Sequence, residues 1–290
     1  MSVSRREFLV KGGAGVAGAA MFLSATERAD AYPLDGLLGL QSYDVRTQLT
    51  ADLGGTLKTL ASYGYKALDL VVPGQPGQPA AYRQALDAAG MVCHNGHFNA
   101  NGFDEPNWKA TLDVARTLGV KEMVCSGGAP SGRGGTPVTV DSWKAYADKL
   151  NQYGARTKAE GLQLGWHNHG EFQAIAGGGG LNPYDVLMQN TDPAVVKFQI
   201  DVGNCAVAGG DPIMYLTKYP TRFYSMHARD VRDGKSGLAV GEGTLDFKKI
   251  FQLAKAAGVH NYDVETGAPA DVVMEKMKMS AEYLKNFAAV

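Results

Sequence analysis

The stretch Gly161-Leu162-Gln163-Leu164-Gly165-Trp166-His167 contains the pattern on which most of this chain is built. A helical segment, Ser142–Ala159, comes before it, and Gly161 is the kind of residue that ends a helix. The apolar run that follows the glycine predicts a short strand, and the run stops at a polar residue, His167. One unit of the fold is therefore a helix, a glycine, a strand and a polar strand end.

The same unit recurs along the chain. Apolar runs that predict strands lie at Leu37–Ser42, Ala67–Val72, Met91–His94, Glu122–Ser126, Leu162–His167, Val195–Asp201, Phe223–His227 and Tyr262–Glu265. Helical patterns lie at Leu53–Tyr63, Pro79–Ala89, Trp108–Leu118, Ser142–Ala159, Pro183–Gln189, Pro212–Tyr219, Phe247–Ala257 and Asp271–Phe287. Eight strands that alternate with helices, without a break in composition, predict a single α/β domain of the (β/α)₈ type, a TIM barrel.

A doubly wound open sheet is the alternative arrangement for such an alternation. It would require a glycine-rich phosphate-binding turn after the first strand. The first strand ends instead in Gln41-Ser42-Tyr43-Asp44. The closed barrel is therefore favoured.

The N-terminus has the features of an export signal. Ser4-Arg5-Arg6-Glu7-Phe8-Leu9 has the paired arginines of a twin-arginine signal, and Ala29-Asp30-Ala31 supplies a small-x-small cleavage pattern. An amphipathic first helix is the alternative, but four glycines from Gly12 to Gly18 disfavour it. We expect residues 1–31 to be a signal peptide recognised by the twin-arginine machinery, and residues 32–290 to form a periplasmic barrel domain.

Composition excludes several function classes. The chain has 28 basic and 29 acidic residues and a net charge of −1, without a basic stripe, so nucleic-acid binding is not expected. Cys93, Cys125 and Cys205 are far apart and form no CxxC motif, so buried free thiols are expected, with one unassigned disulfide as the alternative in an oxidising periplasm. No segment has the length and hydrophobicity of a stable membrane span.

The chemistry-bearing residues gather at the predicted strand ends. Three short segments, beginning at His94, His167 and His227, hold five of the six histidines, and bare carboxylates at Asp201 and Glu265 end two other apolar runs. The C-terminal ends of the strands meet at one mouth of such a barrel. Imidazole and carboxylate groups that converge there predict a divalent-metal site.

These motifs, taken in order, resemble the sugar phosphate isomerase/epimerase family. The segments that carry the resemblance are Trp166-His167-Asn168-His169-Gly170-Glu171-Phe172, Asp201-Val202-Gly203-Asn204, Gly210-Asp211-Pro212, His227-Ala228-Arg229-Asp230, Gly241-Glu242-Gly243 and Val264-Glu265. That family belongs to the xylose isomerase-like barrels, together with inosose dehydratases, ketose 3-epimerases and endonuclease IV. The resemblance covers essentially all of residues 32–290. It implies one divalent ion (Mn, Mg, Co or Zn) held by a Glu, an Asp, a His and a second Glu.

Three of those ligand positions match Asp201, His227 and Glu265, while the fourth stays open. The epimerase branch has a glutamate at the end of strand five, where this chain has His167. Glu171 is the favoured fourth ligand, which leaves His167 and His169 to act on the substrate together with Glu265. If His167 binds the metal instead, Glu171 becomes a candidate general base.

The resemblance also suggests which residues bind the substrate. These are Gln41 on strand one, His97 after strand three, Asn204 after strand six and Arg229 after strand seven, where lysine is more usual. Asp69, inside strand two, is expected either to join the rim of the site or to support the ligands.

The ligand set suggests chemistry on a sugar. A cation that chelates a carbonyl oxygen and a neighbouring hydroxyl acidifies the carbon between them and favours an enediolate. We expect a metal-dependent isomerase or epimerase acting on an unphosphorylated keto-sugar or sugar derivative, because phosphorylated sugars are mostly cytoplasmic and the glycine-rich loops carry little positive charge.

Three alternatives remain. One is a metal-dependent lyase or hydrolase of 3-keto-glycosides that works by β-elimination, and a less favoured one is a non-catalytic periplasmic sugar-binding barrel. An endonuclease IV-like phosphodiesterase is disfavoured, because it needs a histidine where this chain has Asn204.

Overall fold

The structure is a computed structural model that describes residues 38–72, 77–131 and 138–287. The signal peptide expected at residues 1–31 lies outside these ranges. Within them, no helix is long and apolar enough to cross a membrane.

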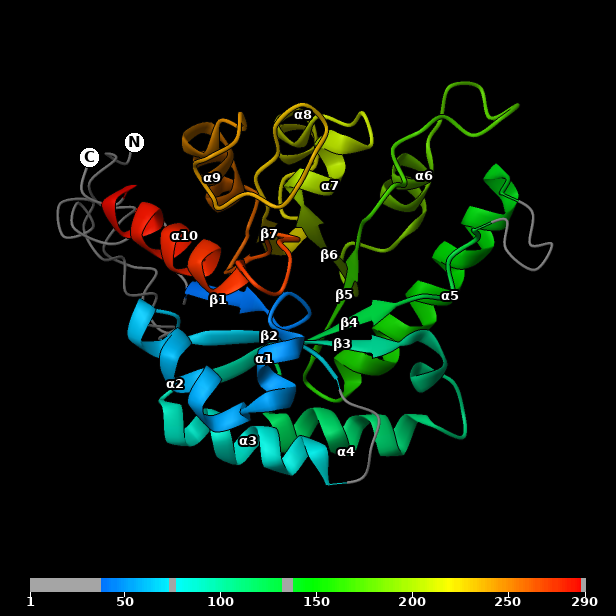
Figure 1. Ribbon diagram of the computed structural model, residues 1–290. Coiled ribbons are helices and arrows are strands. Elements are labelled where there is room, and N and C mark those ends of the chain that lie inside the picture. Colours follow the sequence, from blue (N-terminus) through cyan, green and yellow to red (C-terminus); the bar gives the residue numbers. More distant parts are fainter. Residues whose placement is uncertain (1–37, 73–76, 132–137, 288–290) are drawn as a thin grey trace, which may run out of the picture. The chain divides into compact units, whose positions relative to one another are not determined.

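Eight parallel strands form a closed barrel, which confirms the (β/α)₈ prediction (Figure 1). Each strand pairs with the next in sequence, and β8 closes the barrel by pairing with β1. The strands are β1 (Leu38–Gln41), β2 (Ala67–Val71), β3 (Val92–Asn99), β4 (Glu122–Ser126), β5 (Gln163–His167), β6 (Val196–Asp201), β7 (Phe223–Ala228) and β8 (Asn261–Val264).

Helices connect the strands and surround the barrel (Figure 1). They are α1 (Arg46–Ala51), α2 (Leu53–Tyr63), α3 (Gln78–Ala89), the 3₁₀ helix η1 (Ala100–Phe103), α4 (Trp108–Leu118), α5 (Val140–Ala159), α6 (Pro183–Asn190), α7 (Val202–Val207), α8 (Pro212–Lys218), α9 (Phe247–Ala256) and α10 (Val273–Phe287). Glycines in the left-handed conformation end several of them, as at Gly64 (φ 112°) and Gly119 (φ 78°). The apolar core includes residues of both the strands and the helices, such as Leu40, Phe198, Leu57 and Leu150.

The barrel interior is polar, unlike the branched apolar filling that is usual for this fold. Asp69, Glu122, Gln199 and Asp263 come from four strands and are fully buried. Two strand glycines make space for the carboxylates, because a Cβ on Gly39 would lie 2.0 Å from Asp263 Oδ1 and a Cβ on Gly165 would lie 2.5 Å from Glu122 Oε1. The strands therefore pack apolar side chains against the helices and direct ionisable groups inward.

Two differences from the expected elements affect the functional site. Strand β3 continues to Asn99, so His97 lies within it and not after it. Strand β6 leads directly into α7, a helix that the sequence did not predict. Asp201 is the last residue of the strand and also caps the helix, because its side chain accepts a hydrogen bond from the backbone N–H of Asn204 (2.8 Å).

Candidate metal centre

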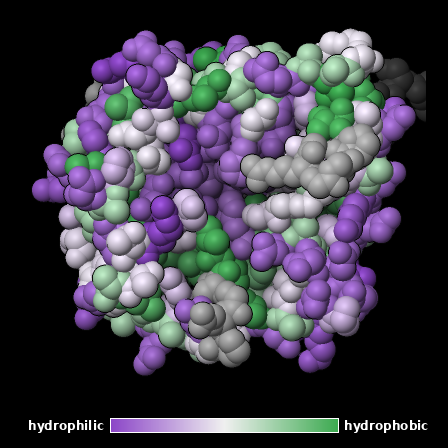
Figure 2. Space-filling view, turned by 45° about the vertical axis from the view of Figure 1, so that its right-hand side comes forward, coloured by the Kyte–Doolittle hydropathy of each residue, from purple (hydrophilic) through white to green (hydrophobic). Residues whose placement is uncertain are grey.

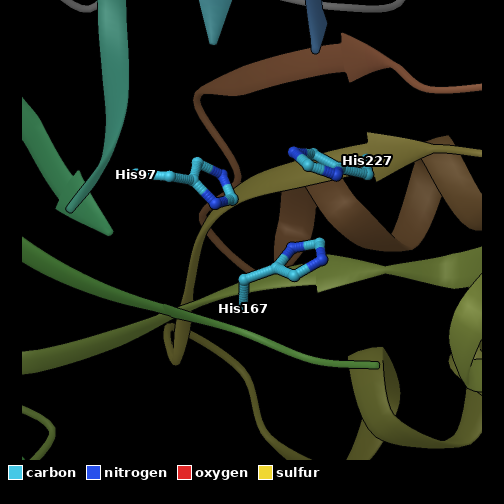
Figure 3. Close-up of side chains that lie close together, drawn as sticks. All are labelled: His97, His167 and His227. Atoms are coloured by element: carbon cyan, nitrogen blue, oxygen red, sulfur yellow. The ribbon is translucent and has the colours of Figure 1, made fainter. Parts of the chain in front are cut away.

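Four buried side chains converge at the C-terminal ends of neighbouring strands. His167 ends β5, Asp201 ends β6, His227 is the penultimate residue of β7 and Glu265 directly follows β8. One donor atom from each of the four lies within 4.8 Å of the others. The imidazole rings of His167 and His227 lie close together, with centroids 4.5 Å apart and a 49° tilt between their planes, and His97 lies beside both (Figure 3). We refer to His167, Asp201, His227 and Glu265 as the four-donor group.

Arg229 joins the two carboxylates of this group. Its Nε donates to Asp201 Oδ2 (2.9 Å), and its terminal nitrogen forms an ion pair with Glu265 Oε1. The packing leaves little freedom to the guanidinium stem, since a Cβ on Gly203 would lie 2.6 Å from Arg229 Cγ. Burial raises the pKa of Asp201 to about 6, although Arg229 opposes that effect. The group thus already attracts a cationic partner.

His227 lies between two carboxylates. Its Nδ1 is 2.6 Å from Glu265 Oε2, and its Nε2 is 2.6 Å from Asp69 Oδ2. Burial would lower the pKa of His227, but the hydrogen bonds to Asp69 and Glu265 outweigh it and hold the pKa well above its ordinary value. The same contacts lower the pKa of Glu265, against the effect of its own burial.

His167 has the opposite electrostatic environment. Its burial, and then the neighbouring His227, His169 and His97, hold its pKa well below the ordinary value, so the ring is neutral at neutral pH. Its Nδ1 is 3.0 Å from Gln199 Oε1. A neutral imidazole held by one nitrogen has the state that metal binding through the other nitrogen requires.

The structure places the expected substrate-binding residues around this group. Gln41 Nε2 is 3.2 Å from His97 Nε2, and His97 Nδ1 is 3.2 Å from Ser126 Oγ. Asn204 lies in the first turn of α7. His169 is exposed, with its ring 4.7 Å from that of His167. Figure 2 turns the strand ends toward the viewer and shows hydrophilic side chains around a hollow.

Glu171, the favoured fourth ligand, is not a member of the four-donor group. The chain turns after β5, and Glu171 Oε2 accepts a hydrogen bond from the backbone N–H of His169 (2.5 Å). Partial burial raises the pKa of Glu171. In this structure His167, and not Glu171, lies together with the other three donors, which is the geometry that the second of the two possibilities requires.

Several residues that support the group were not identified from the sequence. They are Gln199, Asp263 and Ser126, all on strands; Asp263 Oδ1, for example, lies 2.8 Å from His94 Nε2. Their signal is a period of two, as in Gln199–Asp201 and Asn261–Asp263, where every second residue is polar within an otherwise apolar strand.

The donor set is suited to a divalent transition metal. Two imidazoles and two carboxylates favour Mn, Co, Fe or Zn over Mg, which prefers oxygen ligands. Both carboxylates of the group already pair with cationic side chains, Asp201 with Arg229 and Glu265 with Arg229 and His227, so they are anions that attract positive charge. The residues therefore fit the single ion that the sequence predicts.

The fold agrees with the comparisons to known proteins. The family model described as "Xylose isomerase-like TIM barrel" matches residues 57–286, and the chain belongs to this family.

Individual relatives carry two different activities. The chain is 27% identical to an inosose dehydratase of Geobacillus thermodenitrificans over 65% of this chain and 73% of that protein. It is 30% identical to an inosose dehydratase of Salmonella typhimurium, and this match covers 50% of the chain and only 55% of that protein. A solved structure of a sugar phosphate isomerase/epimerase from Parabacteroides distasonis is 28% identical, with a TM-score of 0.73 over 86% of this chain and 93% of that one.

Proposed function

We propose that this protein is a divalent-metal-dependent enzyme that removes a proton next to the carbonyl of an unphosphorylated keto-sugar or sugar derivative, and that it isomerises or epimerises that sugar. The observation that carries the proposal is the four-donor group, buried at the strand ends where barrel enzymes build their active sites.

The proposed residue roles follow from position. His167, Asp201, His227 and Glu265 hold the ion, which when bound supplies a positive charge that polarises a substrate carbonyl. His169 reaches solvent beside His167 and is the group best placed to move a proton to or from the substrate. Glu171, which contacts the backbone of His169, is the second candidate base.

Side chains on β1, on β3 and directly after β7 are proposed to form hydrogen bonds with the substrate oxygens. Gln41, the last residue of β1, and His97, within β3, lie side by side, and both carry polar nitrogens. Arg229 supplies donors next to Asp201 and Glu265. These groups are proposed to orient the sugar so that one carbon faces His169.

A metal-dependent lyase is the second candidate, and the inosose dehydratase relatives favour it. Loss of the same proton, followed by departure of a β-oxygen, gives elimination, for instance from a 3-keto-glycoside. The two reactions share the first step and differ in whether a proton is returned to carbon or a C–O bond breaks.

Solvent exchange tests the shared step. The protein, freed of metal and reloaded with Mn, Co or Zn, is incubated in D₂O with a panel of keto-sugars and 3-keto-glycosides, and products are followed by ¹H NMR. Deuterium at the carbon next to the carbonyl supports the proposal; a rearranged sugar identifies an isomerase or epimerase, and a released aglycone or an enone identifies a lyase. A metal-loaded protein that exchanges no proton in any substrate would contradict it and favour a sugar-binding role.

Export to the periplasm is also part of the proposal, and it rests on Arg5 and Arg6. Replacing both arginines by lysine should retain the protein in the cytoplasm, as measured by cell fractionation. Equal periplasmic amounts of both forms would contradict a twin-arginine route.

A further inference from the structure

Asp69 lies below the four-donor group, near the middle of β2, and is completely buried. Four side chains from four other strands approach its Oδ2 atom. Gln199 Nε2 lies at 2.9 Å, His227 Nε2 at 2.6 Å, His97 Nε2 at 3.1 Å and Gln41 Nε2 at 3.3 Å. A buried carboxylate with this many nitrogen partners is a hub that connects much of the barrel interior.

The groups around the Oδ2 atom decide which way its partners are oriented. The amide nitrogens of Gln199 and Gln41 can only donate hydrogen bonds, so Oδ2 is the acceptor of both. The imidazole nitrogens of His227 and His97 face the same acceptor oxygen. Each nitrogen that faces Oδ2 therefore carries a hydrogen.

For His227 the consequence is direct. The hydrogen lies on Nε2, which faces Asp69, so in the neutral ring Nδ1 carries the lone pair. Nδ1 is the nitrogen that faces Glu265 and the four-donor group.

Asp69 affects His167 through Gln199, which hydrogen-bonds to both. The amide NH₂ of Gln199 must face Asp69, so its Oε1 faces His167 Nδ1 and can only accept. His167 Nδ1 therefore carries the hydrogen, and the lone pair lies on Nε2.

We infer that Asp69 is a positioning residue that selects opposite ring nitrogens on the two histidines, so that His227 offers Nδ1 and His167 offers Nε2 to the bound cation. The inference rests on the proposed metal site and assigns a role to a carboxylate that does not itself belong to the four-donor group. Carboxylates that accept the second N–H of a ligating histidine fix its tautomer and strengthen metal binding.

Cadmium-113 NMR tests the assignment without measuring activity. The protein with ¹⁵N-labelled histidine is loaded with ¹¹³Cd²⁺, and the cadmium–nitrogen coupling is read in long-range ¹H–¹⁵N spectra, in which Nδ1 and Nε2 of each ring give different cross-peak patterns. Coupling to His227 Nδ1 and His167 Nε2 is expected. Coupling to the other nitrogen of either ring would overturn the inference and leave the metal site intact, whereas a protein that binds no cadmium would overturn both.

Two variants distinguish the direct effect of Asp69 on His227 from its effect on His167 through Gln199. Asp69→Asn should weaken cadmium binding about 10- to 100-fold and disturb both couplings, because either face of an amide can turn toward the histidines. Gln199→Leu should disturb only the coupling of His167 and leave His227 Nδ1 bound.

Glu122→Gln is the matched control, because it neutralises another fully buried carboxylate of the interior whose hydrogen-bond partner is Ser225. It should leave both couplings and the cadmium affinity unchanged. If Asp69→Asn also left them unchanged, the inference would be wrong.

Discussion

At the scale of single residues, the barrel interior depends on pairing buried charges. His227 is kept cationic in the absence of metal by Asp69 and Glu265, while His167, 4.5 Å away, is kept neutral by burial and by its histidine neighbours. Two identical side chains thus differ in charge because one faces carboxylates and the other faces imidazoles and an amide.

Glu265→Gln is predicted to abolish activity while the fold persists. The amide cannot replace the anionic ligand next to His227 and Arg229. Loss of a residue that only hydrogen-bonds to a metal ligand lowers metal affinity roughly 10- to 100-fold, and loss of the ligand itself should lower it further. Calorimetric titration measures the metal affinity, and circular dichroism shows whether the fold persists. Glu282→Gln, on the exposed face of α10, is the control and should behave like the wild type; unchanged turnover in Glu265→Gln would disprove the assignment.

Glu122→Gln is predicted to stabilise the protein at pH 8 more than at pH 5. Burial holds the pKa of Glu122 well above its ordinary value, so the folded state retains a proton that the unfolded state loses above about pH 4.3. The wild type therefore loses stability as pH rises from there toward the folded pKa, by about 1.4 kcal/mol for each unit between the two pKa values. Glutamine carries no such penalty and can still accept from Ser225.

Urea unfolding of both proteins at the two pH values measures this difference. A free energy of unfolding that differs between variant and wild type by the same amount at pH 5 and pH 8 would show that Glu122 is not protonated in the folded protein.

At the scale of elements, the strand–helix alternation was readable from sequence because glycines end the helices and apolar runs follow at once. The ends of strands were harder to predict. Strand β3 continues through His94, Asn95 and His97, whose polar side chains contact the buried carboxylates Asp263 and Asp69. A register shift against β2 also interrupts the two-residue alternation there, so the sequence shows no regular strand pattern.

The fourth member of the donor group was equally hard to choose, because the turn after β5 decides it. Spacing alone allows Glu171 to fold back toward the strand end. The hydrogen bond from the backbone of His169 holds it beside the group instead, and no sequence pattern specifies that local contact.

Gly39→Ala is predicted to destabilise the barrel by about 1–3 kcal/mol. The new Cβ would lie 2.0 Å from Asp263 Oδ1. This carboxylate has little room to move, because His94 contacts its Oδ1 and Asn95 donates to its Oδ2. Gly54→Ala on α2 is the control, since nothing lies within 4 Å of its Cβ and alanine favours the helix by roughly 0.5–1 kcal/mol. Thermal unfolding should show opposite shifts for the two variants; a Gly39→Ala protein as stable as the wild type would contradict the packing described here.

At the scale of the whole molecule, the barrel brings residues 41 and 265 to one site by closing β8 onto β1. The sequence predicted this architecture and the gathering of histidines and carboxylates at the strand ends. It named Asp69 as a rim or supporting residue but did not predict its partners, which come from strands distant in sequence and meet only after the barrel closes.

Metal binding is predicted to stabilise the entire barrel, because ligands from four strands meet only in the folded state. A cation at 100 times its dissociation constant should add about 2.7 kcal/mol to the free energy of unfolding. Thermal unfolding with and without a chelator measures this, and Asp201→Asn should show a much smaller difference. Equal melting temperatures with chelator and with excess Mn, Co or Zn would contradict a metal site shared by the strands.

The central claim is that one divalent ion binds between β5, β6, β7 and β8. Crystals of the manganese-loaded protein, measured with X-rays above and below the manganese absorption edge, test it most directly. We predict a single anomalous peak within bonding distance of His167, Asp201, His227 and Glu265. No peak at this place, or a peak bound by Glu171 without His167, would contradict the account.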